Sequence, residues 1–279
     1  MDFAAAGVSL QARLSRFHVL YYQLWAWMMR DKEYFHMYEE EESHWWYVGM
    51  RFIVSALLPP GKLPPNPLVL DAGCGTGYNL GWLRRTYDAV TIGIDYSPLA
   101  LQLCRRRKEK ALIQADAARL PFADAVFDLV VSLDVMTHLD DKAARCQALQ
   151  EFRRVLKPRS LILLRVAAHK WLRSSHDDAI ETRHRYSKSE LREETIEAGF
   201  QPQRITYANT ILFPGAVVWR ILKKARLAPA GSDVCATTRL GSRLNQWMTC
   251  VLKLEAAILR RTRWNFPFGL SIFILADKP

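Results

Sequence analysis

A glycine-rich loop between an apolar strand and a helix constrains this chain most. Residues 68–70 are Leu-Val-Leu, residues 71–77 read Asp-Ala-Gly-Cys-Gly-Thr-Gly, and a helical pattern starts at residue 79. Glycines adopt backbone angles that other residues avoid and let a ligand come close to the main chain. In folds of this kind, ligands bind at the carboxyl ends of the strands. The loop therefore predicts a small-molecule site.

The loop differs from the dinucleotide fingerprint. That fingerprint reads Gly-x-Gly-x-x-Gly and holds a pyrophosphate at the helix N-terminus. Here Gly73, Gly75 and Gly77 follow one another at every second position, and Tyr78 occupies the place of the third glycine. The carboxylate of Asp71 suits an ammonium group better than a pyrophosphate, because opposite charges attract. These residues favour a cofactor with an amino-acid end.

Two further acidic residues close the strands that follow. Asp95 comes after residues 90–94, about 20 residues beyond the loop, where an acid accepts hydrogen bonds from ribose hydroxyls. Asp116 comes after residues 111–115, where a carboxylate can accept from an exocyclic amine such as adenine N6. The N–H of Ala117 could donate to a ring nitrogen. The three acids thus predict contacts with an amino group, a ribose and an adenine.

Short apolar runs alternate with helical patterns along the chain, which favours an α/β fold with a parallel sheet covered on both faces. The strands that we expect are 68–70, 90–94, 111–115, 127–133, 160–166 and 270–276. The expected helices are 79–85, 98–110, 142–156 and 189–198. Apolar residues at helical spacing also predict helices within 8–29 and around 244–259.

These residues resemble the class I S-adenosylmethionine-dependent methyltransferases, and specifically a type 11-like subgroup. The resemblance runs from about residue 68 to residue 166. It includes the loop 71–77, the acids Asp95 and Asp116, and the segments 120–122, 127–130 and 153–158. The family implies a Rossmann-like sheet of seven mostly parallel strands with an antiparallel last strand. N-terminal helices and a helical insertion before the last strand would complete the fold.

The resemblance also implies a cofactor site for S-adenosylmethionine, with S-adenosylhomocysteine as the product. The three glycines would line the methionine end, Asp95 would hold the ribose, and Asp116 and Ala117 would read the adenine. The full predicted set is Trp46, Arg51, Asp71, Gly73, Cys74, Gly75, Gly77, Tyr78, Asn79, Asp95, Tyr96, Ser97, Asp116, Ala117, Leu133, Asp134 and Val135.

Two flanking segments resemble segments of the same subgroup. Upstream, residues 44–51 read His-Trp-Trp-Tyr-Val-Gly-Met-Arg. Their aromatic residues could cover the cofactor and Arg51 could pair with its carboxylate, or Trp45 and Trp46 could be core residues of a covering helix. Downstream, residues 171–178 and 184–187 carry a His-Asp pair and a later histidine. Such side chains can move protons near neutral pH.

The catalytic prediction follows from these segments. An oxygen or carbon acceptor usually needs a base, and we expect His176 or His184 to be that base, oriented by Asp177. Tyr186 and His138 complete the predicted catalytic set. The alternative is that these histidines are hydrogen-bonded residues of a structural loop. Histidines 169, 176 and 184 match no metal-ligand spacing, so no metal is predicted.

The positive charge of the chain is concentrated near its end. Residues 201–279 contribute +9 of the formal net charge of +11, with a cluster at Arg220, Lys223, Lys224 and Arg226. This suggests an anionic neighbour, namely lipid head groups, nucleic acid or an acidic substrate, or else a solubilising face. The segment after residues 127–133 lacks the tetrapeptide typical of enzymes that methylate base amines. We therefore expect a small-molecule or lipid-linked substrate, and nucleic acid is an unlikely one. The amphipathic helices of the C-terminal third are expected to pack as a cap on the sheet, and peripheral membrane contact is the alternative.

The five cysteines form no Cys-x-x-Cys pair and their number is odd, which favours a reduced, cytoplasmic setting, peripherally at the membrane at most. We expect three parts: a helical region 1–60 covering the cofactor, a cofactor-binding core 61–200, and residues 201–279 with a basic helical cap and the final strand. The predicted function is methyl transfer. The alternative is a non-catalytic S-adenosylmethionine-binding partner or sensor that interacts through its basic C-terminal region.

Overall fold

The strands form one mixed sheet in the computed structural model, which describes residues 31–225, 227, 233 and 241–279. In chain order the strands are β1 Leu68–Ala72, β2 Val90–Asp95, β3 Leu112–Gln114, β4 Phe127–Leu133, β5 Leu156–Ala167, β6 Gln201–Ala208 and β7 Ser271–Asp277. Across the sheet the order is β3-β2-β1-β4-β5-β7-β6. β7 pairs antiparallel with both β5 and β6, and the other pairs are parallel. The predicted seven-stranded Rossmann-like sheet with a reversed last strand is confirmed.

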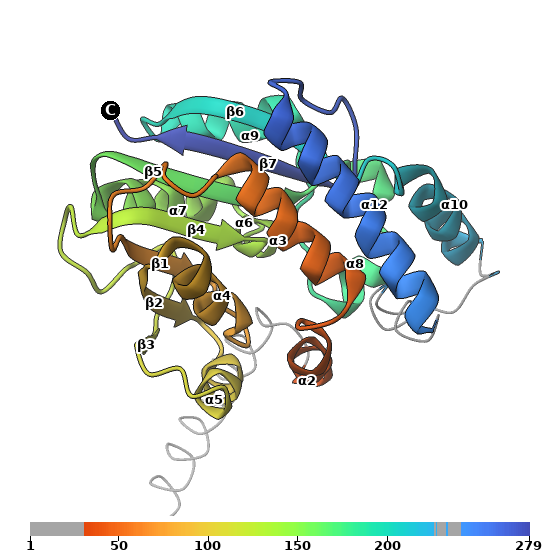
Figure 1. Cartoon of the computed structure of the whole chain (residues 1–279), viewed down its shortest axis with the longest axis horizontal. Coiled ribbons are helices and arrows are strands. Elements are labelled where there is room, and N and C mark those ends of the chain that lie inside the picture. Colours follow the sequence, from red (N-terminus) through yellow and green to blue (C-terminus); the bar gives the residue numbers. More distant parts are fainter. Residues whose placement is uncertain (1–30, 226, 228–232, 234–240) are drawn as a thin grey trace, which may run out of the picture.

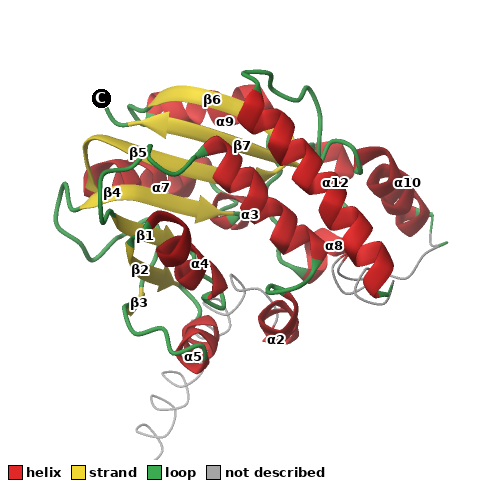
Figure 2. Cartoon of the chain, viewed as in Figure 1, coloured by secondary structure: helices red, strands yellow, loops and turns green. Residues whose placement is uncertain are grey.

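Helices cover both faces of this sheet (Figures 1 and 2). The helices are α2 Asp31–Glu40, α3 Trp45–Leu57, α4 Tyr78–Tyr87, α5 Pro98–Arg106, α6 Val135–His138, α7 Lys142–Val155, α8 Ser175–Ala179, α9 Lys188–Glu197, α10 Phe213–Lys224 and α12 Ser242–Arg261, with a short 3-10 helix η1 at Lys170–Leu172. α3 and α12 lie side by side over one face, and α7 and α9 lie on the other. No helix among the described residues is long and apolar enough to cross a membrane.

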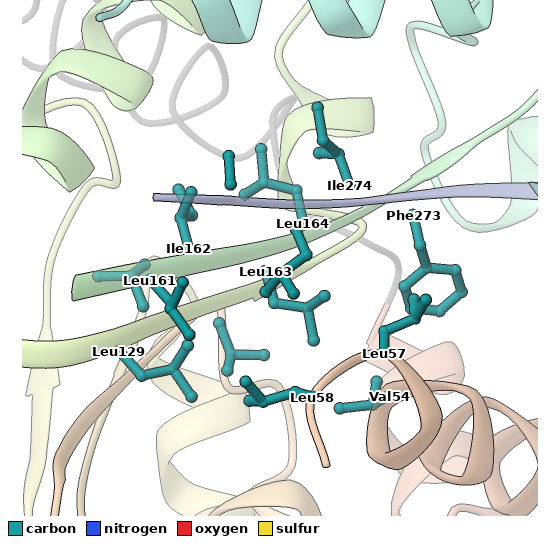
Figure 3. Packing of buried hydrophobic residues seen from close by; sticks show 14 of the residues in the cluster. Val54, Leu57, Leu58, Leu129, Leu161, Ile162, Leu163, Leu164, Phe273 and Ile274 are labelled. Carbon is teal, nitrogen blue, oxygen red and sulfur yellow. The ribbon is translucent and has the colours of Figure 1, made fainter. Parts of the chain in front are cut away.

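The core lies between α3 and the central strands (Figure 3). Leu57 of α3 lies next to Phe273 of β7, and Leu58 just after α3 faces the strands that carry Leu129 and Leu163. All of these side chains are at most 4% exposed. Each buried aliphatic or aromatic side chain contributes roughly 1.5–3 kcal/mol relative to full exposure. This packing fixes α3, and with it the segment 44–51, against the sheet.

A glycine allows α3 and α12 to approach closely. A Cβ atom on Gly49 would lie 2.1 Å from Cδ1 and 2.7 Å from Cβ of Leu252, which is too close for any side chain. Leu252 is fully buried in the core. The glycine of the segment 44–51 therefore has a packing role that ties the N-terminal helices to the C-terminal ones.

Several sequence expectations differ from the structure at element ends. No strand was expected at β6, which is half-exposed and alternates polar with apolar residues, so it lacks a continuous apolar run. The expected helix 98–110 ends at Arg106, and Lys108 has a left-handed φ of 67° that a helix cannot continue. The expected helix 8–29 lies outside the described residues.

Candidate cofactor and acceptor site

One large cavity follows the carboxyl edge of the sheet. Its volume is about 1050 Å³, at the upper end of the roughly 300–1000 Å³ typical of small-molecule sites. The first residues beyond several strands line it: Gly73 after β1, Asp134 after β4 and Asn209 after β6. Ser271, the first residue of the reversed strand β7, lines it as well. The cavity thus extends across nearly the whole sheet, from the glycine loop to the far edge.

The glycine loop has the geometry that its sequence predicted. Gly73 and Gly77 have φ values of 83° and 89°, in the left-handed region that side chains disfavour. A Cβ on Gly73 would also lie 2.0 Å from Cγ2 of Val135. The loop is held from β2, because the N–H of Gly75 donates to Oδ2 of Asp95 at 2.9 Å. This turns the chain sharply at the cavity wall.

The three strand-end acids lie along the carboxyl edge of the sheet, but they differ in burial and in hydrogen bonding. Asp71 is 1% exposed and lies behind the lining residues, and its Oδ2 has no hydrogen-bond partner among the described residues. Asp95 lines the cavity and accepts from the N–H groups of Gly75 and Ser97. Asp116 lines the cavity from the exposed side and accepts from the N–H of Ala118.

A fourth carboxylate joins them from the N-terminal helices. Glu41, just after α2, is 5% exposed, accepts a hydrogen bond from the hydroxyl of Thr76 in the glycine loop, and pairs with Arg107 at 3.1 Å. Burial raises the pKa of Glu41 to about 7. Burial, reinforced by the charges of Asp95 and Glu41, raises the pKa of Asp71 to about 7. Burial also raises the pKa of Asp95 to about 6. This end of the cavity favours a cationic ligand.

The segment 44–51 contributes both to the core and to the cavity. Trp45 is 7% exposed and packs in the core. Its main-chain N–H donates to Oδ1 of Asn245 on α12 at 2.7 Å. Trp46 lines the cavity, and its ring lies 4.5 Å from the guanidinium of Arg165. Arg51 also lines the cavity, but its terminal nitrogens donate to the carbonyls of Glu41 and Glu42. Its guanidinium therefore holds the α2–α3 turn in place.

Most of the predicted cofactor residues do line the cavity. Besides those described above, they are Cys74, Gly75, Asn79, Tyr96, Ala117, Leu133, Asp134 and Val135. Gly77, Tyr78 and Ser97 do not line it. Ser97 instead caps α5, because its side chain accepts from the N–H of Ala100. Tyr78 begins α4, and its ring lies 4.4 Å below the guanidinium of Arg51.

Three of the predicted catalytic residues lie outside the cavity. His184, Tyr186 and Asp177 do not line the cavity. Nε2 of His184 lies 2.9 Å from Oε1 of Glu190, and the Tyr186 hydroxyl, which is fully buried, donates to Glu194. These contacts hold the loop onto α9. Asp177 pairs with Arg185 at 2.6 Å and caps α8, so it does not orient a histidine base.

His176 lines the cavity, but its bonding does not suit a base. Its Nδ1 accepts a hydrogen bond from the N–H of Asp233 at 3.0 Å, so the proton of the neutral ring is on Nε2. Burial lowers the pKa of His176 to about 4. A neutral ring with Nε2 protonated is a hydrogen-bond donor toward the cavity. This bonding favours a hydrogen-bond donor role for His176 over the predicted role as the base.

His138 has the opposite tautomer. Its Nδ1 lies 2.9 Å from the carbonyl oxygen of Glu181, and a carbonyl can only accept, so Nδ1 carries the proton. Nε2 is left with a lone pair. Burial lowers the pKa of His138, which keeps the ring neutral at pH 7. Among the predicted catalytic residues on the cavity wall, His138 has an unprotonated ring nitrogen that accepts no hydrogen bond from the described residues, whereas the unprotonated Nδ1 of His176 is occupied by the N–H of Asp233.

Several lining residues were not predicted from the sequence. They are Glu41, Arg165, Arg185, Asn209, Trp219 and Arg220. Arg165 and Arg185 had a usable signal, since the first interrupts an apolar strand and the second lies between two of the predicted residues. Asn209 had none. It is fully buried with a left-handed φ of 58°, and neither amide atom of its side chain has a hydrogen-bond partner among the described residues.

No group of three or more His, Cys, Asp or Glu residues that could hold a metal ion is found within the described part of the chain. Of the charged groups that line the cavity, Glu41, Asp95 and Asp116 lie at the glycine-loop end beside Arg51, whereas Arg165 lies on β5 and Arg185 and Arg220 follow it in the chain.

Comparison with known proteins now places the chain. Residues 70–164 match the family model described as a methyltransferase domain. This segment therefore resembles a methyltransferase domain. This domain spans β1 to β5 and carries the glycine loop, Asp95, Asp116 and Asp134. The predicted resemblance to class I methyltransferases is thereby confirmed at the level of the domain and fold, while the subgroup motifs at 44–51 and 176–186 stay predictions.

The chain resembles both curated relatives and solved structures. It is 31% identical over 158 residues to the tRNA (carboxymethyluridine(34)-5-O)-methyltransferase of Arabidopsis thaliana, a match that covers 55% of this chain and 36% of that protein. The chain therefore spans about a third of that relative's length. A Haloferax volcanii protein, solved in complex with the Trm112 methyltransferase activator, has a TM-score of 0.58 at 21% identity over 89% of this chain and 95% of that one.

A second solved structure has a similar fold. The Haemonchus contortus phosphoethanolamine N-methyltransferase 2 was solved with phosphomonomethylethanolamine and S-adenosylhomocysteine. It has a TM-score of 0.52 at 18% identity, over 81% of this chain and 52% of that one.

The comparisons correct the expected partners. Nucleic acid was judged unlikely, yet the Arabidopsis relative and further curated relatives from Homo sapiens and Xenopus tropicalis carry tRNA methyltransferase names. The missing tetrapeptide argues only against methylation of base amines. It therefore does not exclude other methylations of a nucleic acid. The expected membrane contact receives no support from the comparisons. The cytoplasmic localisation and the three-part domain division stay predictions.

Proposed function

We propose that the protein transfers a methyl group from S-adenosylmethionine to an acceptor bound in the half of the cavity beyond β5. The observation that carries this proposal is the single cavity that extends from the glycine loop to residues 209–220 and 244–248 beyond β5. In this proposal Asp71 and the loop take the amino group, Asp95 the ribose, and Asp116 with Ala117 the adenine. The unpartnered Oδ2 of Asp71 supports the first assignment.

The residues fit this cofactor chemically. Four carboxylates surround the loop end of the cavity, and S-adenosylmethionine carries an ammonium and a sulfonium charge. Asp95 already accepts two backbone N–H groups, but a carboxylate has about four lone-pair sites and so can still accept from ribose hydroxyls. The bound cofactor supplies a methyl group that the sulfonium has already activated.

The protein's own task is then to align the acceptor and to remove its proton. Alignment at about 3 Å from the methyl carbon converts a bimolecular step into an intramolecular one. His138 is the residue that we propose as the base, through Nε2, for an acceptor that must lose a proton. Glu181 holds the ring by its carbonyl oxygen and fixes the tautomer.

The acceptor half supports a small-molecule or lipid-linked acceptor with an apolar body. Its lining includes Ile211, Leu212, Ala216, Trp219, Trp247 and Met248. A tRNA nucleoside is the second candidate, because curated relatives carry tRNA methyltransferase names. A cavity of this size would admit a single nucleoside turned out of its stack.

To test this proposal, a cell extract is first divided into fractions that each contain one class of acceptor. The purified protein is incubated with a methyl-labelled donor and with the lipid, small-molecule and tRNA fractions of a cell extract. S-adenosylhomocysteine and labelled products are then measured by mass spectrometry. We expect label in one compound of the first two fractions. Label in tRNA would select the second candidate, and cofactor binding without turnover in any fraction would favour the sensor. Asp95→Ala, which removes the proposed ribose acceptor, serves as the control with reduced turnover.

A further inference from the structure

The far end of the cavity contains a cluster of buried charged side chains that the proposed methyl transfer does not use. Arg185 and Arg220 line the cavity and are each 6% exposed, and Lys223 lies directly behind them at 8%. The acids near them are Asp177, which is fully buried, and Asp233. We call these five residues, together with His176, the arginine recess.

In α10 two charged side chains face the protein interior and two apolar ones face solvent. Arg220 and Lys223 face inward, while Val218 and Ile221 of the same helix are 57% and 56% exposed. Burying an ionised side chain is unfavourable unless it is paired, so apolar packing alone does not explain this orientation of the helix. The cluster at 220–226 was expected either to meet an anion or to form a solubilising face. For Arg220 and Lys223 the second interpretation is wrong, because both are buried.

Ion pairs connect the charged side chains of the recess. Three cations, Arg185, Arg220 and Lys223, lie with two carboxylates, Asp177 and Asp233. Asp233 is shared by two of the cations, at 3.1 Å from Nη2 of Arg220 and 2.6 Å from Nζ of Lys223. Asp177 pairs with Arg185 alone, at 2.6 Å from Nε. The two arginines also lie close enough that the charge of Arg220 lowers the pKa of Arg185.

Hydrogen-bond donors remain available at the cavity wall. Arg185 donates from Nε to Asp177 and from Nη1 to the carbonyl of Ala168, but its Nη2 has no partner among the described residues. His176, whose Nδ1 accepts from Asp233, presents Nε2–H as a donor. A guanidinium edge and a ring N–H on one cavity wall form a donor set that binds a carboxylate or phosphate.

We propose that the arginine recess binds an anionic group of the methyl acceptor, a carboxylate or a phosphate, through Arg185 and Nε2–H of His176. This rests on the proposed function and narrows its acceptor class to an anion with an apolar body. The recess lies beyond β5, whereas the carboxylates around the glycine loop lie at β1 to β3, so the two ends of the cavity select opposite charges. The acceptor would thus be drawn into one orientation, with its charge away from the methyl donor.

The experiment uses three probes that share a benzyl body: phenylacetate, benzylphosphonate and the neutral phenylacetamide. Their dissociation constants are measured by NMR titration with the S-adenosylhomocysteine-bound protein. In the wild type, we expect one or both anions to bind at least tenfold more tightly than the amide. The better of the two anions distinguishes a carboxylate site from a phosphate site. Equal binding of all three probes would overturn the proposal.

A double variant locates the preference. Arg185→Gln with Asp177→Asn removes the recess donor together with its partner, so no unpaired charge is left buried, and the asparagine keeps an oxygen to cap α8. The matched control is Arg145→Gln with Glu194→Gln, a buried pair 2.9 Å apart that does not line the cavity. The anion preference should disappear in the first variant and persist in the second. Preference retained in the first variant would contradict the proposed site.

Cofactor affinity is measured alongside in all three proteins. Calorimetric titration with S-adenosylhomocysteine should give the same dissociation constant within about twofold in each. If the wild type did not bind S-adenosylhomocysteine, this would count against the proposed function. The preference among the three probes is also measured without S-adenosylhomocysteine, so it still tests whether the recess binds an anion. Circular dichroism verifies that both double variants are folded.

Discussion

Arg165 on β5 donates from Nε and Nη2 to the carboxylate of Asp134 at the end of β4, with Nη2 2.5 Å from Oδ2. The same guanidinium lies over the ring of Trp46 in α3. Arg165 is 7% exposed, and its charge lowers the pKa of Asp71, although burial dominates and raises that pKa overall. One side chain thereby connects the strand edge, the covering helix and the charge balance of the cofactor end.

Replacing Arg165 should weaken cofactor binding. In Arg165→Gln, Asp134 loses its ion-pair partner and Asp71 loses the cation that favours its ionised form. We expect the dissociation constant of S-adenosylmethionine to rise about tenfold at pH 7.5, which equals about 1.4 kcal/mol. Isothermal titration calorimetry measures it. Arg154→Gln, which breaks a pair with Glu151 outside the cavity, is the control and should bind as the wild type does.

The carboxylates around the glycine loop make cofactor binding dependent on pH. Burial raises the pKa of Asp95 to about 6 and those of Asp71 and Glu41 to about 7, whereas free carboxyls titrate near pH 4. Their contribution to the stability of the cofactor-free protein is therefore present below about pH 4 and is lost as the pH rises through 6 to 7. A cationic ligand favours the ionised forms, so its binding releases protons and strengthens over the same range.

Thermal unfolding checks this dependence. The increase in melting temperature caused by S-adenosylmethionine should be larger at pH 8 than at pH 5.5. S-adenosylhomocysteine lacks the sulfonium charge and should show a smaller dependence, which makes it the matched control ligand. Asp71→Asn removes one of the titrating groups and should flatten the curve. An increase in melting temperature that is equal at all pH values for S-adenosylmethionine would contradict the electrostatic account.

The sequence predicted the part of the fold in which apolar runs are continuous. β1, β2 and β4 are buried parallel strands and were recognised with their connecting helices. β6 was missed because it is half-exposed and its polar residues interrupt the pattern. The reversed pairing of β7 came from the resemblance to a family, since no pattern within residues 271–277 states the direction of a strand.

The site was predictable where it lies in one continuous motif and not where distant segments meet. Gly73, Asp95 and Asp134 line the cavity as expected, because each follows a strand whose end is fixed by the sheet. The catalytic histidines could not be ranked from the sequence, because tautomers depend on partners such as the carbonyl of Glu181. The orientation of α10 could not be predicted from the sequence either. Charged side chains are normally expected on the solvent face of a helix, and their burial here depends on partners such as Asp233, which lies in another segment.

Gly49 should be intolerant of substitution. Gly49→Ala places a Cβ 2.1 Å from Leu252 and forces α3 and α12 apart. Such overpacking typically costs about 1–3 kcal/mol, so we expect the melting temperature to fall by several degrees. Gly215→Ala on α10 is the control, because no heavy atom lies within 4 Å of its Cβ position and its φ is not left-handed. A double-mutant cycle with Leu252→Ala should show that the alanine at position 49 costs less once the leucine is shortened.

His138 provides the sharpest test of the chemistry. In His138→Gln, the side chain keeps a polar group near Glu181 but has no ring nitrogen of suitable basicity. With the acceptor identified by labelling, we expect kcat to fall about 100-fold, the lower end of what a positioned base contributes. The affinity for S-adenosylhomocysteine should be unchanged, because the glycine loop and its carboxylates are intact.

His184→Gln is the matched variant, since that histidine lies outside the cavity against Glu190, and its kcat should stay within about twofold of the wild type. If both variants kept full turnover, the acceptor would be one that needs no base, such as a neutral amine. A large loss in the His184 variant alone would return the base to the loop after β5 and contradict the assignment made from the tautomers.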